Sequence, residues 1–517
     1  MLILIPTLIL FITALALIIL SAIRPAFRFA WLVAMIGSLL AFLITLFWQF
    51  QTPLNISLPP WQISAIFNEA PSFRGDGLSW PYAISLTALT LSILLTSVVR
   101  PALANSFAWA GTLALSGLGV LAVTAENPLT LLLVWAALDL TELVTQLRSV
   151  DSPAFSERVV IGFATRAAGL GLLLWANIVS ASTGNRLNFD ALSPQASLLL
   201  IAAAGLRLGV LPLNLSYPTL SNLRRGFGTA LRLVAAASSL ALLSKIPKEG
   251  AVSSLTPFLF VLTVIAAIYG GWMWLRAPDE LTGRRFWIIG LAALAVSCAL
   301  GLNPTGAAAW GCALVIAGGA LFLTTVQQVW LNRALLIGAW SISSLPFSIT
   351  ANVWSKGNYG FFLPFLLIAQ VFLTAGFVRH SLRSGGREAF DIKPDLPRNV
   401  YPAGIVLLLL MQILLGFYGW DGALQIGFWP AGLAVTLLTF GLIWLTPRLR
   451  LLNPVRAHWV KPASTRLDRI YSGLWGFYQL LGQITQAVTA TLEGAGGIMW
   501  TLLFMVLFIS LMTQTKP

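Results

Sequence analysis

The chain has 517 residues, 58% of them hydrophobic and only 9% charged. Because a soluble globular domain carries about 25% charged residues, this composition excludes a soluble protein and indicates one that crosses a membrane many times. The net charge of +14 does not indicate nucleic-acid binding, since the basic residues lie in short loops between apolar spans, where they orient the protein and contact anionic lipid head groups.

Long apolar runs follow one another along most of the chain and predict an all-α fold with about sixteen transmembrane helices. The first run, residues 2–20, has neither a basic region before it nor a small-residue cleavage site after it, so we expect a retained helix and not a signal peptide. The predicted spans are 2–20, 29–49, 78–99, 106–125, 128–147, 159–181, 194–216, 227–246, 255–275, 286–302, 305–326, 334–351, 358–378, 401–418, 425–446 and 496–512.

Basic residues are distributed unevenly between the loops. Counted from the N terminus, the odd-numbered loops up to residue 400 carry roughly three times as many Arg and Lys residues as the even-numbered loops. This excess predicts that the odd-numbered loops face the cytoplasm and that both termini lie on the other side of the membrane. We expect an integral protein of a bacterial plasma membrane.

The fifth predicted span, residues 128–147, contains two acids, Asp139 and Glu142, which share one helix face with Trp135. An acid near the bilayer centre costs at least about 2.5–3.5 kcal/mol on insertion scales, so it needs a partner or a function. The next three spans supply candidate partners in Arg166, Arg207 and Arg232. We expect these residues to form a fixed network of buried ion pairs.

Other roles are open for some of these residues. Asp139 could be a satisfied polar residue between helices, and Arg166 and Arg232 could extend to lipid head groups instead. Gln370 and Gln412 are expected to form hydrogen bonds between helices, with a water path as the alternative.

Proline interrupts two of the predicted spans. Pro212 follows Arg207 in the seventh span, and Pro346 lies in the twelfth span before Lys356. Proline removes a backbone hydrogen bond, which is tolerated at membrane depth where the freed groups face protein or water. Two interrupted helices in corresponding places of two halves indicate an ion or substrate path near the middle of the membrane. Lys356 is therefore a candidate for that path, or a residue of a surface loop.

Residues 464–492 have apolar residues at every third or fourth position with polar ones between them. This pattern predicts an amphipathic helix that lies along the membrane or along neighbouring helices. A simple linker before the last span is the alternative.

No cofactor or metal is expected to bind this chain. Cys298 and Cys312 lie in apolar spans without paired spacing, and His380 and His458 are isolated in polar segments. The sequence contains no phosphate-binding loop, dinucleotide fingerprint or cysteine cluster. Redox chemistry, if the protein takes part in it, would therefore belong to partner subunits.

Four stretches of the sequence resemble motifs of the antiporter-like proton-translocating subunits of respiratory complex I (NADH-quinone oxidoreductase), and they occur in the same order as in that family. Subunits of this family are shared with Mrp-type cation/proton antiporters and membrane-bound hydrogenases. A basic pair in GRRF, residues 283–286, also matches in position. The four stretches are FRGDGLSW (73–80), ENPLTLLLVW (126–135), GLRLGVLPLNLSYP (205–218) and WSISSLPFSITANVWSK (340–356).

The resemblance implies two inverted five-helix repeats, each with a broken helix, and a buried chain of Glu, Lys and His residues that passes protons. It divides the chain into N-terminal helices (1–105), a first repeat (106–246), a second repeat (255–380), a C-terminal pair (401–446), and a lateral helix with the last span (464–517). The sequence departs from the family where the proton chemistry is expected: Ala136 occupies the position of the fifth-helix acid, and Arg207 that of the seventh-helix lysine.

The substitution of Arg for Lys matters because a proton relay needs groups that change charge. A buried lysine can lose its proton, whereas a guanidinium stays protonated in proteins. The leading hypothesis is therefore a membrane subunit of a complex I-like or Mrp-like assembly with a degenerate proton path, partnered by other membrane subunits and at most a non-redox part of an enzyme. The alternatives are an active antiporter module that uses Asp139, Glu142 and Lys356, and an unrelated solute or lipid-linked sugar transporter.

Overall fold

The computed structural model describes most of residues 2–445, and it forms two compact units, Met1–Pro454 and Val455–Pro517. All described residues belong to the first unit. The predicted amphipathic helix (464–492) and the last span (496–512) lie outside them, as do residues 25–26, 28, 59–69, 100–105, 149–152, 183–188, 190–191, 215–224, 248–253, 384–387, 390–394 and 421–422.

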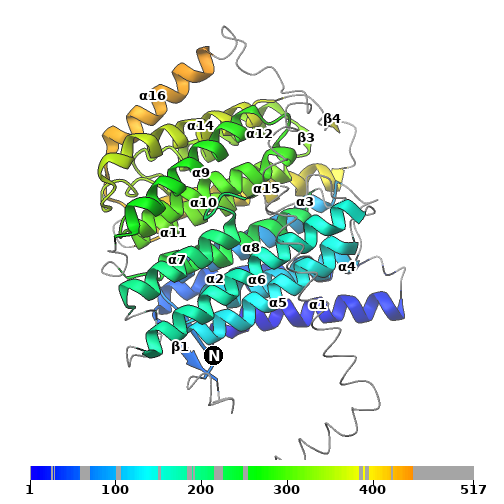
Figure 1. The fold of residues 1–517 in the computed structure, drawn as a ribbon. Helices are drawn as coiled ribbons and strands as arrows, with labels where there is room; N and C mark the ends of the chain where they lie inside the picture. The colour runs from blue at the N-terminus through cyan, green and yellow to red at the C-terminus, as the bar shows by residue number, and fades with distance from the viewer. Residues whose placement is uncertain are drawn as a thin grey trace, which may run out of the picture. The chain divides into compact units, whose positions relative to one another are not determined.

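The first unit is a helical bundle (Figure 1), which confirms the predicted all-α class. Within the described residues, twelve helices are long and apolar enough to cross a membrane, so the chain is an integral membrane protein. The helices are α1 (Leu4–Ile23), α2 (Ala30–Phe47), α3 (Ser79–Ser97), α4 (Ser106–Thr124), α5 (Pro128–Arg148), α6 (Pro153–Ser182), α7 (Pro194–Leu208), α8 (Phe227–Ser244), α9 (Thr256–Arg276), α10 (Glu280–Leu300), α11 (Pro304–Leu323), α12 (Val329–Ala334), α13 (Leu336–Ser341), α14 (Leu363–Ser381), α15 (Asp395–Tyr418) and α16 (Trp429–Leu445).

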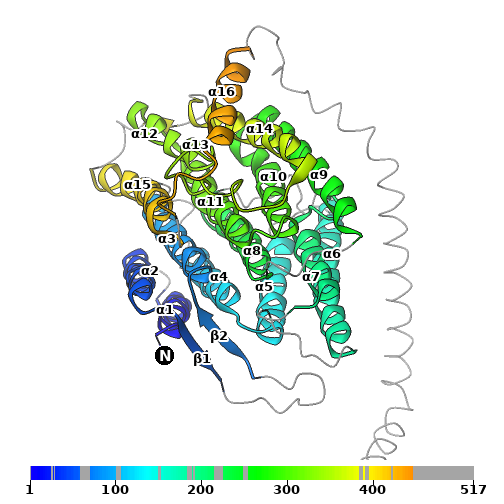
Figure 2. The ribbon, with the colours of Figure 1, turned by 90° about the vertical axis from the view of Figure 1, so that its left-hand side faces the viewer.

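Four helices form the centre of the bundle: α3, α8, α10 and α11. Nearly all of their side chains are buried within the protein, and α11, rich in Gly and Ala, is buried along its whole apolar window. Small residues let membrane helices approach closely, and a helix that is apolar on all sides belongs in the interior. Figure 2 shows α1 and α2 on one side of this centre and α6, α7 and α9 on the other.

Short strands occupy two connections. β1 (Leu54–Ser57) pairs antiparallel with β2 (Ser72–Gly75), and β3 (Val326–Gln327) pairs in parallel with β4 (Glu388–Ala389). Phe73 of β2 also bridges to Ala125, at the end of α4. The first pair therefore holds the long connection between α2 and α3 against the start of α5.

The seventh helix ends earlier than predicted. The sequence suggested a span over 194–216 interrupted by Pro212, but α7 ends at Leu208 and Pro212 lies in the turns that follow it. The helix ends because Gly209 adopts a left-handed conformation with φ 76°, and the next N–H, that of Val210, bonds back to the carbonyl of Gly205 at 2.8 Å. The glycine, three residues before the proline, sets the break.

The predicted span 334–351 is interrupted, as Pro346 indicated, but the interruption begins earlier, after Ser341. α12 and α13 are short, and residues 342–359, including Pro346, form a series of turns that we call the broken segment. Serines compete with the helix for backbone hydrogen bonds, and proline disfavours helix at the preceding residue. The amide of Gln370 in α14 holds this segment: it donates to the carbonyl of Ile342 at 2.8 Å and accepts from Trp354 Nε1 at 2.9 Å.

Three glycines from the C-terminal part of the bundle allow the backbone of the broken segment to pack closely against them. A Cβ placed on Gly416, Gly427 or Gly432 would lie between 2.1 and 2.3 Å from the carbonyl oxygens of Phe347, Ala351 and Ser344, respectively. These distances are far below van der Waals contact, so only glycine allows α15, α16 and their connection to pack here.

Replacing Gly416 with alanine should therefore destabilise the protein. Because the new methyl group would meet a backbone oxygen, which cannot rotate away, we expect Gly416→Ala to lower the free energy of unfolding by about 1–3 kcal/mol. Gly441→Ala, in exposed helix α16 with nothing within 4 Å of the added Cβ, is the matched control and should be neutral or slightly stabilising. Thermal unfolding in detergent measures both, and equal effects of the two changes would contradict the packing argument.

Candidate functional site

The site is built around the middle of α5. Asn127 caps this helix by accepting a hydrogen bond from the N–H of Thr130 at 2.9 Å, and Pro128 is its first residue. Asp139 and Glu142 are each 2% exposed, and Trp135 on the same face is fully buried. The spacing that predicted a shared buried face is thus confirmed for these three side chains.

Arg207 is the partner of Asp139. Its two terminal nitrogens, Nη1 and Nη2, donate to Oδ2 and Oδ1 of Asp139 at 2.6 and 2.8 Å, which is a bidentate pair. Its Nε donates to Ser239 Oγ of α8 at 3.2 Å, and its guanidinium lies 4.1 Å from the centre of the Trp135 ring. Arg207 lies in the last turn of α7, where the helix dipole favours a positive charge.

Arg166 of α6 is the partner of Glu142. Both of its terminal nitrogens bond to the carboxylate oxygens of Glu142, and Nη1 also lies 3.8 Å from Asp139 Oδ1. Gln146, one turn further along α5, donates its amide to the same carboxylate. Glu142 therefore has a charged partner and a neutral one.

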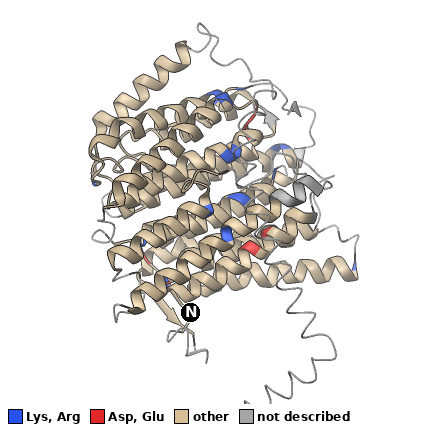
Figure 3. Cartoon of the chain, viewed as in Figure 1, with Lys and Arg blue, Asp and Glu red and all other residues tan. Residues whose placement is uncertain are grey.

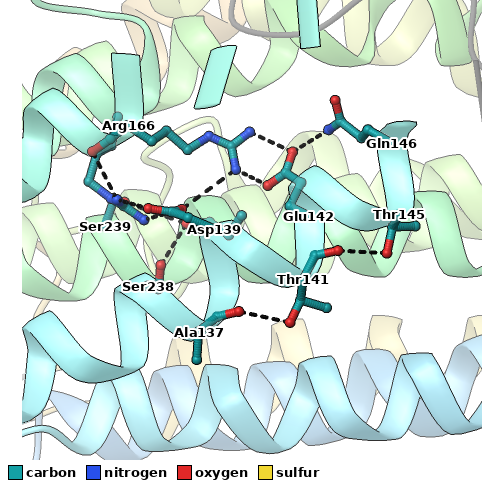
Figure 4. A network of polar contacts seen from close by, with 11 residues as sticks. Ala137, Asp139, Thr141, Glu142, Thr145, Gln146, Arg166, Ser238 and Ser239 are labelled. Atoms are coloured by element: carbon teal, nitrogen blue, oxygen red, sulfur yellow. Dashed lines mark hydrogen bonds and ion pairs between the residues drawn. The ribbon is translucent and has the colours of Figure 1, made fainter. Parts of the chain in front are cut away.

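The two pairs form one network that joins four helices (Figure 4). Arg207 Nη1 also donates to the backbone carbonyl of Arg166 at 3.3 Å, so each arginine contacts the other as well as its own acid. The two positive and two negative charges cancel, and all four side chains are at most 5% exposed. Figure 3 shows acidic and basic residues side by side in this region of the bundle. Such closed pairing makes buried charge tolerable.

Sequence reasoning missed three residues of the network: Gln146, Ser239 and Gly169. A Cβ on Gly169 would lie 2.6 Å from Arg207 Cγ, so the glycine makes room for the arginine stem. Gln146 could have been found as the residue four positions after Glu142. Ser239 could not, because only the packing of α8 against α7 brings it to Arg207.

Two further residues were candidates for the site, Arg232 and Lys356. Arg232 is buried in α8, 6% exposed, and lies seven residues before Ser239. The described ion pairs of Asp139 and Glu142 are with Arg166 and Arg207, so a role for Arg232 in the network stays a prediction. Lys356 lies in an exposed turn of the broken segment, as the surface alternative proposed.

His380 corrects another expectation. It is not in a polar loop but fully buried in the last turn of α14, where its Nε2 lies 3.1 Å from the carbonyl oxygen of Trp274 and its ring 4.4 Å from the Trp274 ring. Cys298 and Cys312 are free, buried thiols, and among the described residues no three His, Cys, Asp or Glu side chains converge as metal ligands would. The sequence placed His380 wrongly because α14 extends to Ser381, past the predicted end at 378.

An ion pair outside the network links the ends of three helices. Arg225, just before α8, pairs with Glu280 at the start of α10 at 2.7 Å and donates to the carbonyls of Phe322 and Thr324 at the end of α11. Nearby, Arg284 of α10 donates to Thr229 of α8 at 2.9 Å. These contacts join the predicted first repeat to the second.

Known proteins resemble this chain in structure but not detectably in sequence. No protein-family model and no curated protein matches the sequence. Solved structures do match. The chain aligns over its whole length with 63% of a chain in the Mrp complex from Dietzia sp. DQ12-45-1b, at 14% identity and a TM-score of 0.69. Over 97% of its length it aligns with 99% of a chain in the membrane-bound sulfane sulfur reductase, an archaeal respiratory membrane complex (12% identity, TM-score 0.65).

A third match is a chain of respiratory complex I from Thermus thermophilus with bound NADH. The alignment covers 85% of the present protein and all of the complex I chain, at 17% identity and a TM-score of 0.62. The chain shares its fold with a chain of each of these complexes. This agrees with the family that the sequence resembles, while the division into two inverted repeats stays a prediction. The present protein spans less than two thirds of the length of the Mrp-complex chain, but nearly all of the length of the other two chains.

The closed charge balance of the network predicts a specific pattern of stabilities. Asp139→Asn or Arg207→Gln alone leaves an uncompensated buried charge, and each should lower the free energy of unfolding by about 3–5 kcal/mol. The double variant Asp139→Asn/Arg207→Gln removes one charge of each sign and should be less destabilised than the sum of the two single variants. Thermal unfolding of the four proteins in detergent gives the coupling; simple additivity would show that the two residues do not act as a pair.

Proposed function

We propose that the chain is an antiporter-like membrane subunit of a multi-subunit, complex I-like or Mrp-like assembly, and that its first half supports the assembly without carrying protons. The shared fold supports the first part, because the matched chains come from multi-subunit membrane complexes. The bidentate pair between Asp139 and Arg207 carries the second part.

The chemistry of Arg207 makes it unsuited to a proton relay. A relay group must exist in two protonation states during turnover, and a guanidinium paired at both terminal nitrogens keeps its proton. The second basic partner in the network, Arg166, is also an arginine. Both acids are thus held by fixed positive charges, and proton movement through them would require breaking a buried pair and leaving a charge without its partner.

Two places in the second half where the resemblance implies titratable groups do not supply a buried one. α11, at the centre of the bundle, contains no charged residue, and Lys356 lies in an exposed turn instead of the interior. The proposed role in a respiratory assembly places electron transfer, and any cofactor for it, in partner subunits. The fold match argues against an unrelated solute or lipid-linked sugar transporter.

Purification of the native assembly through a tag on this chain tests the first part. We expect co-purifying membrane subunits in fixed ratio; a chain that is isolated alone and transports ions in vesicles would support the stand-alone antiporter and contradict the proposal.

Ion flux in vesicles that contain the whole assembly tests the second part. The charge-balanced variant Asp139→Asn/Arg207→Gln should keep the flux per assembled complex close to that of the wild type, because it removes no group that changes charge. Complete loss of flux at normal assembly and thermal stability would show that the pair is part of an active ion path.

A further inference from the structure

Gln412 in α15 stands out among the buried polar residues of the described chain. It is fully buried, and neither its amide nitrogen nor its amide oxygen has a hydrogen-bond partner among the described residues. Gln370, the other glutamine buried in this part of the bundle, bonds through both its nitrogen and its oxygen. An amide can form four hydrogen bonds, and burial without any is strongly unfavourable.

The neighbours of Gln412 along α15 show where its side chain lies. One turn before it, Leu408 contacts α11, with Cδ1 3.4 Å from the position of a Cβ on Gly319. One turn after it, Gly416 packs against the carbonyl oxygen of Phe347. Residues four apart share a helix face. Gln412 therefore lies between α11 and the broken segment.

A second polar group without a partner lies next to Phe347. The hydroxyl of Ser348 is buried, the residue being 2% exposed, and it also lacks a hydrogen-bond partner among the described residues. The Gln412 amide and the Ser348 hydroxyl thus belong to two segments that pack against each other at Gly416, beside the interruption of a membrane helix, and together they supply three polar atoms without a hydrogen-bond partner among the described residues.

We propose that this junction is a buried hydration site, in which one or more water molecules bridge the Gln412 amide and the Ser348 hydroxyl. Internal waters typically make about three hydrogen bonds to polar groups that would otherwise be unsatisfied. Interrupted backbone at membrane depth needs such partners. The ligand is neutral: α11 and residues 335–354 contain no charged side chain that would balance a bound cation.

Replacing the amide with an apolar group of similar size distinguishes a wet site from a dry one. In a dry site Gln412→Leu removes an unsatisfied amide and raises the melting temperature. In a hydrated site the same change removes the hydrogen bonds between Gln412 and the water, which leaves the water and Ser348 with fewer partners, and the melting temperature falls. We expect the fall, and a smaller effect of Ser348→Ala in the Gln412→Leu background than in the wild type, because both residues bind the same water.

Met411→Leu, on the same turn of α15, is the matched control for packing and should leave the melting temperature nearly unchanged. If Gln412→Leu does not fold, a density map of the wild-type protein at a resolution that shows ordered water decides the question. A peak within hydrogen-bond distance of both side chains supports the site. A rise in melting temperature, a map without such a peak, or stabilisation by sodium chloride but not choline chloride would overturn the proposal.

Discussion

The bidentate ion pair between Asp139 and Arg207 is the interaction on which the first half of the protein depends. It joins α5 to α7 at the turn where α7 ends, and through Arg166 and Ser239 it extends to α6 and α8. Arg207 can occupy this position because Gly169 leaves room for its stem and because the end of α7 favours positive charge. The pairing of two acids with two arginines then lets four charged groups lie in the interior of the bundle.

The two helix interruptions are stabilised by different chemistry. Near the first, at Gly209, the groups that fill the interior are charged and paired. At the second, between Ser341 and Tyr359, they are neutral: Gln370 bonds to the broken segment, and Gly416 and its neighbours let the backbone pack closely. The fold shared with these respiratory and Mrp-complex chains is thus compatible here with an interior held by fixed charges and amides, and fold alone does not imply function.

Much of the architecture follows from the sequence because apolar spans of membrane length have few alternatives to helices. The shared face of Trp135, Asp139 and Glu142, and the approach of Arg166 and Arg207 to it, were predictable from spacing and from the cost of a buried acid. The ends of helices were not: a left-handed glycine ended α7 before Pro212, and the second interruption began in the serine-rich run after Ser341, before Pro346. Ser239 and Gly169 depend on how α6, α7 and α8 pack, which no local pattern encodes.

The central claim is that Asp139 and Glu142 are fixed ion-pair partners of arginine and do not carry protons through the protein. Infrared difference spectroscopy of the native assembly during turnover measures proton uptake by buried carboxyl groups directly, with Asp139→Asn and Glu142→Gln used to assign the bands. We expect that no protonated-carboxyl band belonging to either residue appears or disappears during turnover. A band that changes during turnover and is absent from either variant would contradict it.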